Sequence, residues 1–317
     1  PYPIHSFTTN NAGFRAARSL EETSMSGEIR VFVTGGSAAW GAGVRQEDLY
    51  TRIAEKELRK EFPDRPNIRV VCAGVGAYCS VQERILTETV ITRYNPDIVI
   101  SFSGWNDSYF GYTGLDIRDG QDYMGYGRKL AWLSGGQVDD LEKVIDPPQY
   151  RDYRVKLHFL LAKSLHRVRF SKSDLAQGVE LRKLEHKQVL ETLLDNIHSL
   201  TDLSRRKGFS MVFMLQPSLY LTCKPLSEWE KLQVAENSAA FTGFPEYNRE
   251  VYRLFRETFP QDSYEKGYTF ADLDLAFSGV EQPLFADHVH FGDRGNRLIG
   301  EYMAQIISPL ISRRLSR

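Results

Sequence analysis

Five short apolar runs, each separated from the next by a longer segment, constrain the fold of this chain most. They are rich in Val, Ile and Phe, and they are too continuous to alternate between a buried face and a solvent face. Strands of this kind occur in parallel sheets that helices cover on both sides. The runs occupy residues 29–34, 68–73, 97–102, 209–215 and 269–275.

Helical periodicity occupies most of the segments between these runs. Apolar residues recur at spacings of three and four in 49–62, 81–94, 181–207 and 294–311. Strands that alternate with helices favour right-handed crossovers and a parallel sheet. The sequence therefore predicts an α/β fold: a doubly wound five-stranded parallel sheet flanked by helices, which is a flavodoxin-like three-layer sandwich.

Two segments interrupt this alternation. Residues 109–178 are rich in Gly, Tyr and Asp, and we expect them to form an inserted cap over one end of the sheet. Residues 218–245, after the fourth strand, are expected to be irregular. We expect residues 1–28 to be an N-terminal lead-in and residues 29–317 to form the folded domain that contains the insertion.

The overall charge excludes some partners. With 40 Lys and Arg against 41 Asp and Glu, the net charge of −1 gives no global field for nucleic acid or an anionic membrane. Three cysteines imply no disulfide framework. No apolar run approaches the roughly 18 residues that span a bilayer. The chain begins at Pro1, so we expect a bacterial envelope location if an anchor precedes it and a cytoplasmic one otherwise.

Polar and glycine residues follow the predicted strands, at the edge of the sheet where such folds bind ligands. The first strand leads into Gly35-Gly36-Ser37 and the third into Ser103-Gly104-Trp105-Asn106-Asp107. The second strand leads into residues 74–77, and the last into residues 286–296. We therefore expect the functional site at this edge.

The glycines after the first strand match neither common phosphate motif. A P-loop needs a lysine where Ala42 stands, after Gly36 and Gly41. A dinucleotide fingerprint needs an acidic residue after the second strand, which ends instead in Ala73-Gly74. The sequence thus predicts no nucleotide at this loop.

The sequence offers Ser37 the partner residues that a reactive serine requires. Serine becomes a nucleophile beside a base that a third group orients. Asp287 and His290 are three residues apart, a spacing at which one turn brings the carboxylate to imidazole Nδ1, with Nε2 facing Ser37. Asn106 offers an amide to a developing oxyanion, and the N–H groups of Ser37 and of the Gly76-Ala77 turn offer further donors.

Four blocks in this order and spacing, "GGSAAWGAG", "AGVGAY", "SGWNDS" and "DHVHFGDRGN", resemble the blocks of the SGNH (GDSL-type) hydrolases. The resemblance runs from about Ile29 to the final helix and leaves the insertion uncovered. It implies an esterase that needs no cofactor. It further implies that Ser37 is nucleophile and oxyanion donor, Asn106 a second donor, His290 the base and Asp287 its orienting partner.

The chain departs from the family pattern at three positions. Gly36 replaces the Asp of the GDS triplet, which removes only a supporting carboxylate, and Cys72 stands where an Asn is frequent. Ala77 occupies the position of the oxyanion-hole glycine, with Gly76 one place early. An alanine N–H serves there if φ is negative, and Gly76 takes the role if φ must be positive. We expect Ala77 to be the donor.

Each of these residues also has a plainer interpretation. Serine between glycines is typical of turns, Asn106-Asp107 of an Asx turn, and Asp287 of a helix cap. His288 beside His290 suggests an alternative, a metal site that these histidines would form with Asp287 and Asp107. Adjacent side chains at 287 and 288 diverge, however, and hard metals need more carboxylates, so we expect no metal or other cofactor.

Two further segments bear on location. Residues 153–172 carry basic residues among apolar ones at helical spacing, which is typical of a membrane-contacting helix or, as we favour, of a cap helix with a solvated basic face. Residues 8–17, "TTNNAGFRAA", resemble the lead-in of membrane-anchored or exported bacterial members of the family. Membrane association would then come from an N-terminal anchor.

The resulting functional hypothesis is hydrolysis of carboxylic esters through an acyl-enzyme. The substrate is expected to be a small-molecule or carbohydrate ester, because the aromatic stretch 109–132 favours sugar stacking, and no nucleic acid partner is expected. Two alternatives use the same fold. One is an O-acyltransferase with the same triad, and the other is a catalytically silent carbohydrate-binding or assembly domain, which the alanine at position 77 favours.

Overall fold

The computed structural model describes residues 7–16, 18–22, 27–64, 67–114, 117, 183–240 and 242–316. Most of the predicted insertion, including the amphipathic segment 153–172, lies outside these residues. Only residues 109–114 and 117 of the insertion are described.

Five parallel strands form one sheet in the order β2-β1-β3-β4-β5. This is the order of a flavodoxin-like doubly wound sheet, so the predicted fold class is confirmed. The first four strands end within one residue of their predicted ends. The fifth ends three residues early, because a 3-10 helix follows it. The strands are β1 Ile29–Gly35, β2 Ile68–Cys72, β3 Ile98–Ser103, β4 Ser210–Leu215 and β5 Thr269–Asp272.

Helices connect the strands and cover both faces of the sheet. Two are 3-10 helices, η1 Ile91–Tyr94 and η4 Leu273–Phe277. The α-helices are α1 Ser37–Trp40, α2 Tyr50–Glu61, α3 Ser80–Thr89, α4 Trp105–Thr113, α8 His186–Lys207, α9 Glu228–Ala240, α10 Phe244–Lys266 and α11 Asp293–Leu315. Among them, in the described part of the chain, none is long and apolar enough to cross a membrane.

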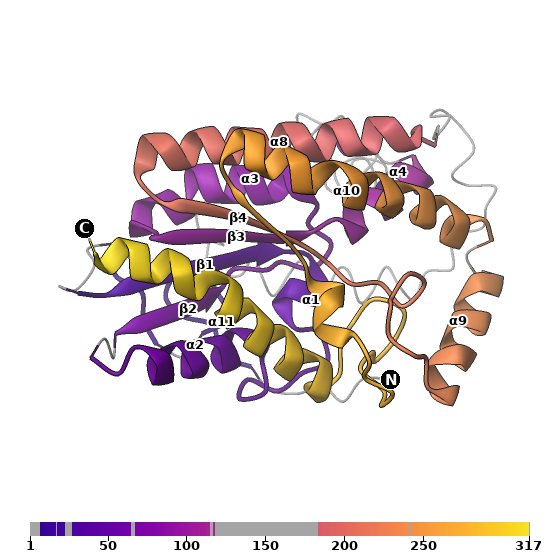
Figure 1. Ribbon diagram of the computed structural model, residues 1–317, viewed down its shortest axis with the longest axis horizontal. Coiled ribbons are helices and arrows are strands. Elements are labelled where there is room, and N and C mark those ends of the chain that lie inside the picture. The colour runs from indigo at the N-terminus through magenta and orange to yellow at the C-terminus, as the bar shows by residue number, and fades with distance from the viewer. Residues whose placement is uncertain are drawn as a thin grey trace, which may run out of the picture.

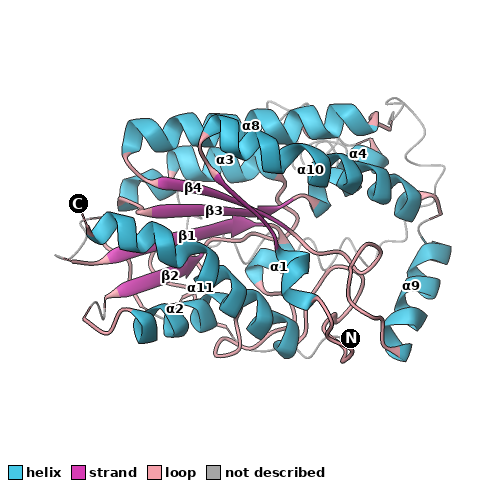
Figure 2. Ribbon diagram, viewed as in Figure 1, coloured by secondary structure: helices cyan, strands magenta, loops and turns pink. Residues whose placement is uncertain are grey.

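The sheet separates two hydrophobic cores. Figure 1 shows α3, α4, α8 and α10 over one face and α2 and α11 over the other. Alternate side chains of β1 pack on opposite faces of the sheet. Phe32 packs in the core beneath α8 and α10, whereas Val31 and Val33 pack in the core beneath α2 and α11. Every residue of β1 is buried, which explains the continuous apolar pattern. Figure 2 shows the three layers by element type.

The helices differ from the predicted organisation at four places. The segment 218–245 is not wholly irregular, because α9 occupies its centre. Residues 109–113 do not begin an insertion but complete α4. The sequence predicts no element for α10, whose interior contains Pro260, a residue that ordinarily ends a helix. The predicted helix 81–94 also divides, into α3 and η1.

The N-terminal arm, described at residues 7–16 and 18–22, packs against the edge of the sheet. Phe14 and Leu20 are buried in the larger core, with exposed fractions of 6% and 1%. Arg15 forms an antiparallel bridge with Cys72 of β2, which is an edge strand, and its N–H donates to the Cys72 carbonyl at 3.2 Å. Residues of the predicted lead-in therefore contribute to the core of the sheet.

A buried polar cluster lies between α3 and the sheet. The hydroxyl groups of Thr34 and Ser101 donate to the carboxyl group of Glu83 at 2.8 and 2.7 Å. Glu83 is fully buried, and burial raises its pKa to about 7; hydroxyl donors oppose the rise and the charge of Asp107 adds to it. Glu83 therefore binds its proton more tightly in the folded chain than in the unfolded chain.

We predict that Glu83→Gln changes how stability depends on pH. The raised pKa of Glu83 makes the free energy of unfolding fall as pH rises from about 4.5, the usual value, through about 7. Glutamine has no proton to lose, so the variant does not show this fall. Between pH 4 and pH 9, the free energy of unfolding of Glu83→Gln should therefore rise relative to that of the native protein by roughly 3 kcal/mol. Urea unfolding across this range measures the shift, with the exposed Glu88→Gln as control. Parallel profiles for native protein and Glu83→Gln would contradict it.

Candidate active site

The topology places two loops at the middle of the sheet edge. The chain passes from β1 outward to β2 on one side and then crosses to β3 on the other, so β1 and β3 flank the topological switch point. These two strands pair with Gly35 opposite Phe102. Helix α1, which begins at Ser37, and helix α4, which contains Asn106, therefore follow these two strands at neighbouring places on the sheet edge. Figure 1 shows α1 at this end of the sheet.

Close packing explains the two glycines before Ser37. Gly35 has φ +145°, and a Cβ there would lie 2.3 Å from the Phe102 carbonyl oxygen. Gly36 is the N-cap of α1, and a Cβ there would lie 2.2 Å from Nδ2 of Asn106. Ser37 is the first residue of α1, so its N–H has no acceptor within the helix.

The structure brings Ser37, His290 and Asp287 together in the predicted order. Ser37 Oγ lies 2.8 Å from His290 Nε2, and His290 Nδ1 lies 2.7 Å from Asp287 Oδ2. A carboxylate can only accept, so Nδ1 carries the proton of the neutral ring and Nε2 accepts from the serine hydroxyl. This is the arrangement of a base poised to take the Ser37 proton.

Asp287 also folds the loop that positions His290. Its Oδ1 accepts the backbone N–H groups of Val289 and His290 at 2.8 and 2.7 Å. One carboxylate thus closes the turn with one oxygen and holds the imidazole with the other. The helix-cap interpretation of Asp287 is wrong, because the N-cap of α11 is Gly292 and Asp287 closes a turn before it. Its contact with His290 is the one that the triad prediction requires.

A buried carboxylate that sequence reasoning missed supports this loop. Glu230, with no exposed surface, accepts the N–H groups of Leu284 and Phe285 and the ammonium of Lys224. Burial raises the pKa of Glu230, but Lys224 and the backbone donors outweigh it, and the pKa is lowered overall. Glu230 belongs to α9, in the segment expected to be irregular, so its sequence position gave no signal for this contact.

Asn106 is fixed from one side. Its Nδ2 donates to the Tyr78 carbonyl at 2.6 Å, which orients the amide and leaves its second N–H for another acceptor. The backbone of Gly36 lies directly against the same nitrogen. Glycine in place of the aspartate of the GDS triplet therefore has an effect beyond the loss of a carboxylate. It leaves room for the Asn106 amide, whose place a side chain at position 36 would occupy.

The turn that contains Gly76 and Ala77 differs from the expected backbone. Tyr78 N–H donates to the Val75 carbonyl at 3.1 Å, and Ala77 has φ +65°, as the third residue of a type II turn requires. The expectation of a negative φ at Ala77 was wrong. The central peptide of this turn joins Gly76 to Ala77 and carries the Ala77 N–H. In a type II turn that peptide is flipped relative to a type I turn, and the flip gives the third residue, Ala77, its positive φ. Which of the two residues donates stays a prediction.

Aromatic rings gather beside the triad. The Trp105 ring stacks on Tyr109 with centroids 5.1 Å apart, and the His288 ring lies 5.4 Å from Trp105 and 5.9 Å from Tyr220. Burial, with the negative charge of Asp287, raises the pKa of Tyr220 to about 12, and burial lowers the pKa of His288. His288 therefore lies in an aromatic cluster.

The acidic residue of the third block faces away from the triad. Asp107 is fully buried and accepts from Ser80 N–H and Ser103 Oγ, so it joins α4 to α3 and β3. Among the described residues, no group of three or more His, Cys, Asp or Glu side chains gathers to hold a metal ion. Cys72, Cys79 and Cys223 are free thiols.

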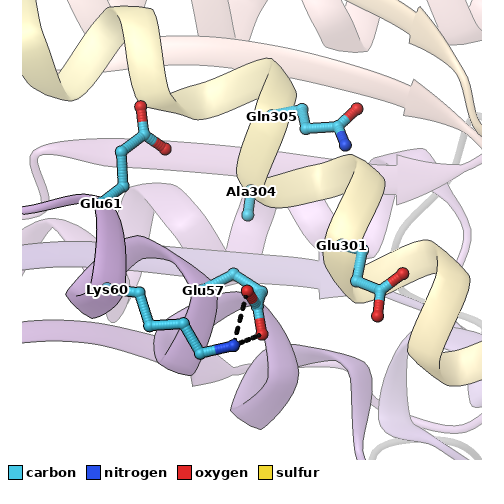
Figure 3. A pocket seen from close by; sticks show the side chains of 6 residues that line it. All are labelled: Glu57, Lys60, Glu61, Glu301, Ala304 and Gln305. Atoms are coloured by element: carbon cyan, nitrogen blue, oxygen red, sulfur yellow. Dashed lines mark hydrogen bonds and ion pairs between the residues drawn. The ribbon is translucent and has the colours of Figure 1, made fainter.

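A separate pocket lies between α2 and α11, the two helices that cover one face of the sheet (Figure 3). Lys60 Nζ donates to both carboxylate oxygens of Glu57 at 2.7 and 2.9 Å. None of the predicted site residues lines this pocket. Its lining residues are Glu57, Lys60, Glu61, Glu301, Ala304 and Gln305.

Solved structures of similar shape are named as esterases and lipolytic proteins. A protein described as lipolytic and of the G-D-S-L family, from Desulfitobacterium hafniense, is 13% identical, with 88% of this chain and 99% of that chain covered and a TM-score of 0.47. The acetyl xylan esterase AlAXEase is 12% identical, with 87% and 98% covered and a TM-score of 0.46. A catalytic mutant of Axe2, an acetylxylan esterase from Geobacillus stearothermophilus, is 13% identical, with 90% and 96% covered and a TM-score of 0.46.

These names agree with the resemblance that the four sequence blocks predict. No protein-family model and no curated protein matches the sequence. At TM-scores below 0.5 the likenesses carry no argument about the chemistry of this chain, which rests on its own side chains.

We predict that Gly36→Ala lowers activity by displacing Asn106. The new methyl group would overlap the amide nitrogen, and the amide is the flexible partner that moves. Asn106 is the predicted oxyanion donor, and the loss of one such donor lowers kcat by about 10²-fold, while thermal stability should change little. Steady-state kinetics on an aryl ester, beside a thermal melt, measures both.

The double variant Gly36→Ala/Asn106→Ala is the control for this mechanism. If the methyl group acts through Asn106, adding Gly36→Ala to Asn106→Ala has no further effect on kcat. Additive losses would show that position 36 acts by another route.

Proposed function

We propose that this protein is a serine hydrolase that cleaves carboxylic esters through an acyl-enzyme. The observation that carries the proposal is the continuous chain from Ser37 Oγ through His290 to Asp287, with both contacts at 2.7–2.8 Å. Serine, imidazole and carboxylate in this order make a weak nucleophile reactive at neutral pH. The contact joins residues 253 positions apart, so local turn formation does not explain it.

The proposed reaction has two halves. Ser37 Oγ attacks the ester carbonyl carbon while His290 Nε2 takes its proton, and Asp287 stabilises the imidazolium. The oxyanion accepts from the Ser37 N–H, the free N–H of the Asn106 amide and the N–H of the Gly76-Ala77 turn. His290 then gives its proton to the departing alcohol oxygen. Water, deprotonated by His290, attacks the acyl carbon of the acyl-enzyme. The bond to Ser37 Oγ then breaks, His290 returns the proton to Ser37 Oγ, and the carboxylic acid leaves.

We further propose O-acyl groups on a carbohydrate as the substrate class. The support is the half-buried rings of Tyr109 and Tyr220, which pack on Trp105 and His288 beside the triad. Ligand sites combine such aromatic faces with a few placed polar groups. Acetyl xylan, on which the named esterases act, is accordingly the first polymer to test.

We predict that a fluorophosphonate probe labels Ser37 and that ester hydrolysis depends on the triad. Intact mass and peptide mapping should show one adduct, on Ser37, that is lost in Ser37→Ala and His290→Ala. Asp287→Asn should retain the fold and lower kcat by about 10⁴-fold, because the imidazole loses the partner that fixes its tautomer.

Three results would decide among the functions. Hydrolysis of an aryl acetate by Ser37→Ala at the native rate would refute the proposal. Acyl product that forms only when an alcohol acceptor is added would indicate a transferase. Glycan binding by a folded, unlabelled native protein would indicate a silent binding domain.

A further inference from the structure

The N-terminal arm contacts the segment that follows Ser37. The Arg15 side chain is buried, with the residue 3% exposed, and its guanidinium donates to the carbonyls of Trp40, Gly41 and Val44 at 2.8, 2.7 and 2.5 Å. We propose that Arg15 is a positioning residue for the nucleophile. The proposal rests on the function proposed above, since it assigns Arg15 a part in the reactivity of Ser37.

The short length of α1 explains why outside donors are needed. A helix of four residues leaves nearly all of its carbonyls without an acceptor bond inside the helix. The Ser37 and Ala38 carbonyls accept from the next turn, at Ala42 and Gly41. From Trp40 onward, Arg15 is the side-chain donor to the carbonyls of Trp40, Gly41 and Val44. The Gly41 carbonyl also accepts from the Val44 N–H at 3.2 Å.

The Ala39 carbonyl completes this set from the other side. It accepts from the Tyr50 hydroxyl at 2.7 Å and from the Cys72 thiol at 3.2 Å. Burial raises the pKa of Cys72 to about 11, which keeps the thiol protonated as a donor at neutral pH. Cys72 thus gives a hydrogen bond at the position where the family often has Asn.

Arg15 itself is held rigidly. Its backbone N–H donates to the Cys72 carbonyl, and the preceding turn is closed by Asn10, whose side chain accepts from the N–H groups of Ala12 and Phe14. Its guanidinium also lies over the rings of Trp40 and Phe7, 5.1 and 5.8 Å from the centroids. A fixed backbone and two stacked rings leave the side chain little freedom.

The fork geometry of arginine is needed for these contacts. Nη1 bridges the Trp40 and Gly41 carbonyls while Nη2 reaches Val44, so two nitrogens on one rigid plane contact three acceptors. A Cβ at Gly41 would lie 2.9 Å from Nη1, which shows how closely backbone and guanidinium pack. A lysine ammonium is a single point and cannot make the same set of bonds.

The consequence concerns Ser37, at the other end of the same helical turn. Without Arg15, the carbonyls of residues 40 and 44 lose their side-chain donor and the carbonyl of residue 41 keeps only the Val44 N–H. Water then replaces the guanidinium, and the turn is free to shift. A displacement of about 1 Å between nucleophile and base costs on the order of 10²-fold in rate. Arg15 therefore contributes to the distance between Ser37 Oγ and His290 Nε2 without touching either atom.

The test compares Arg15→Met, Arg15→Lys and Arg15→Ala with native protein. Variants are kept well below their melting temperature, with folding checked by circular dichroism. We expect the rate of fluorophosphonate labelling at Ser37 and kcat for an aryl acetate to fall by at least about tenfold in each, with KM changed by less than about twofold. Low concentrations of guanidinium should restore the labelling rate of Arg15→Ala, whereas urea should not.

Arg18→Gln is the matched control. Arg18 lies on the same arm, but its side chain is half exposed and its carboxylate partner, Glu55, is on α2. This variant should label and turn over at native rates.

Two results would overturn the proposal. The first is a folded Arg15→Met whose labelling rate and kcat are within about twofold of native. The second is failure of all three variants to fold, which would make Arg15 a residue of global stability. Failure of the proposed function is distinguishable from both, because the native protein itself would then remain unlabelled.

Discussion

Direct pairing of β1 with β3 is the constraint on which the site depends. With Gly35 opposite Phe102, the residues two and four positions beyond them, Ser37 and Asn106, leave the sheet side by side. No equivalent pairing places His290, because its loop follows β5 at the far edge of the sheet. That loop is instead held by hydrogen bonds from the N–H groups of Leu284 and Phe285 to the Glu230 carboxylate. The Leu219 N–H donates to the His288 carbonyl as well.

The nucleophile helix depends on its surroundings in a similar way. One turn of helix has few internal hydrogen bonds and therefore little stability of its own. Its carbonyls are satisfied by Arg15 from the arm, Tyr50 from α2 and Cys72 from β2. Three elements thus converge on four residues. Because most of these donors are buried, each bond is costly to leave unmade, which makes the turn rigid despite its length.

The sequence predicts the sheet well because burial on both faces gives each strand an unbroken apolar run. The sequence also predicts that Ser37, His290 and Asp287 meet at one edge of the sheet, because strand ends can be located from those runs, and the three side chains do lie in contact there. The sequence did not predict α9, because its amphipathic character is weak. It did not predict α10, because that helix contains Pro260. Contacts between distant segments, such as Arg15 with Val44 or Glu230 with Leu284, follow from packing and have no local pattern. The φ of Ala77 follows from its turn type, which residue identity alone did not indicate.

The contact between Gly36 and the Asn106 amide has a consequence for how this sequence can change. Positions 36 and 106 share one volume, so the residue tolerated at one depends on the residue at the other. An aspartate at position 36, as in the GDS triplet, requires the amide to move first. A single substitution toward the common triplet thus passes through a form with a misplaced amide. Glycine at position 36 is therefore matched to the neighbouring amide and not to the local backbone, whose φ of −80° other residues can adopt.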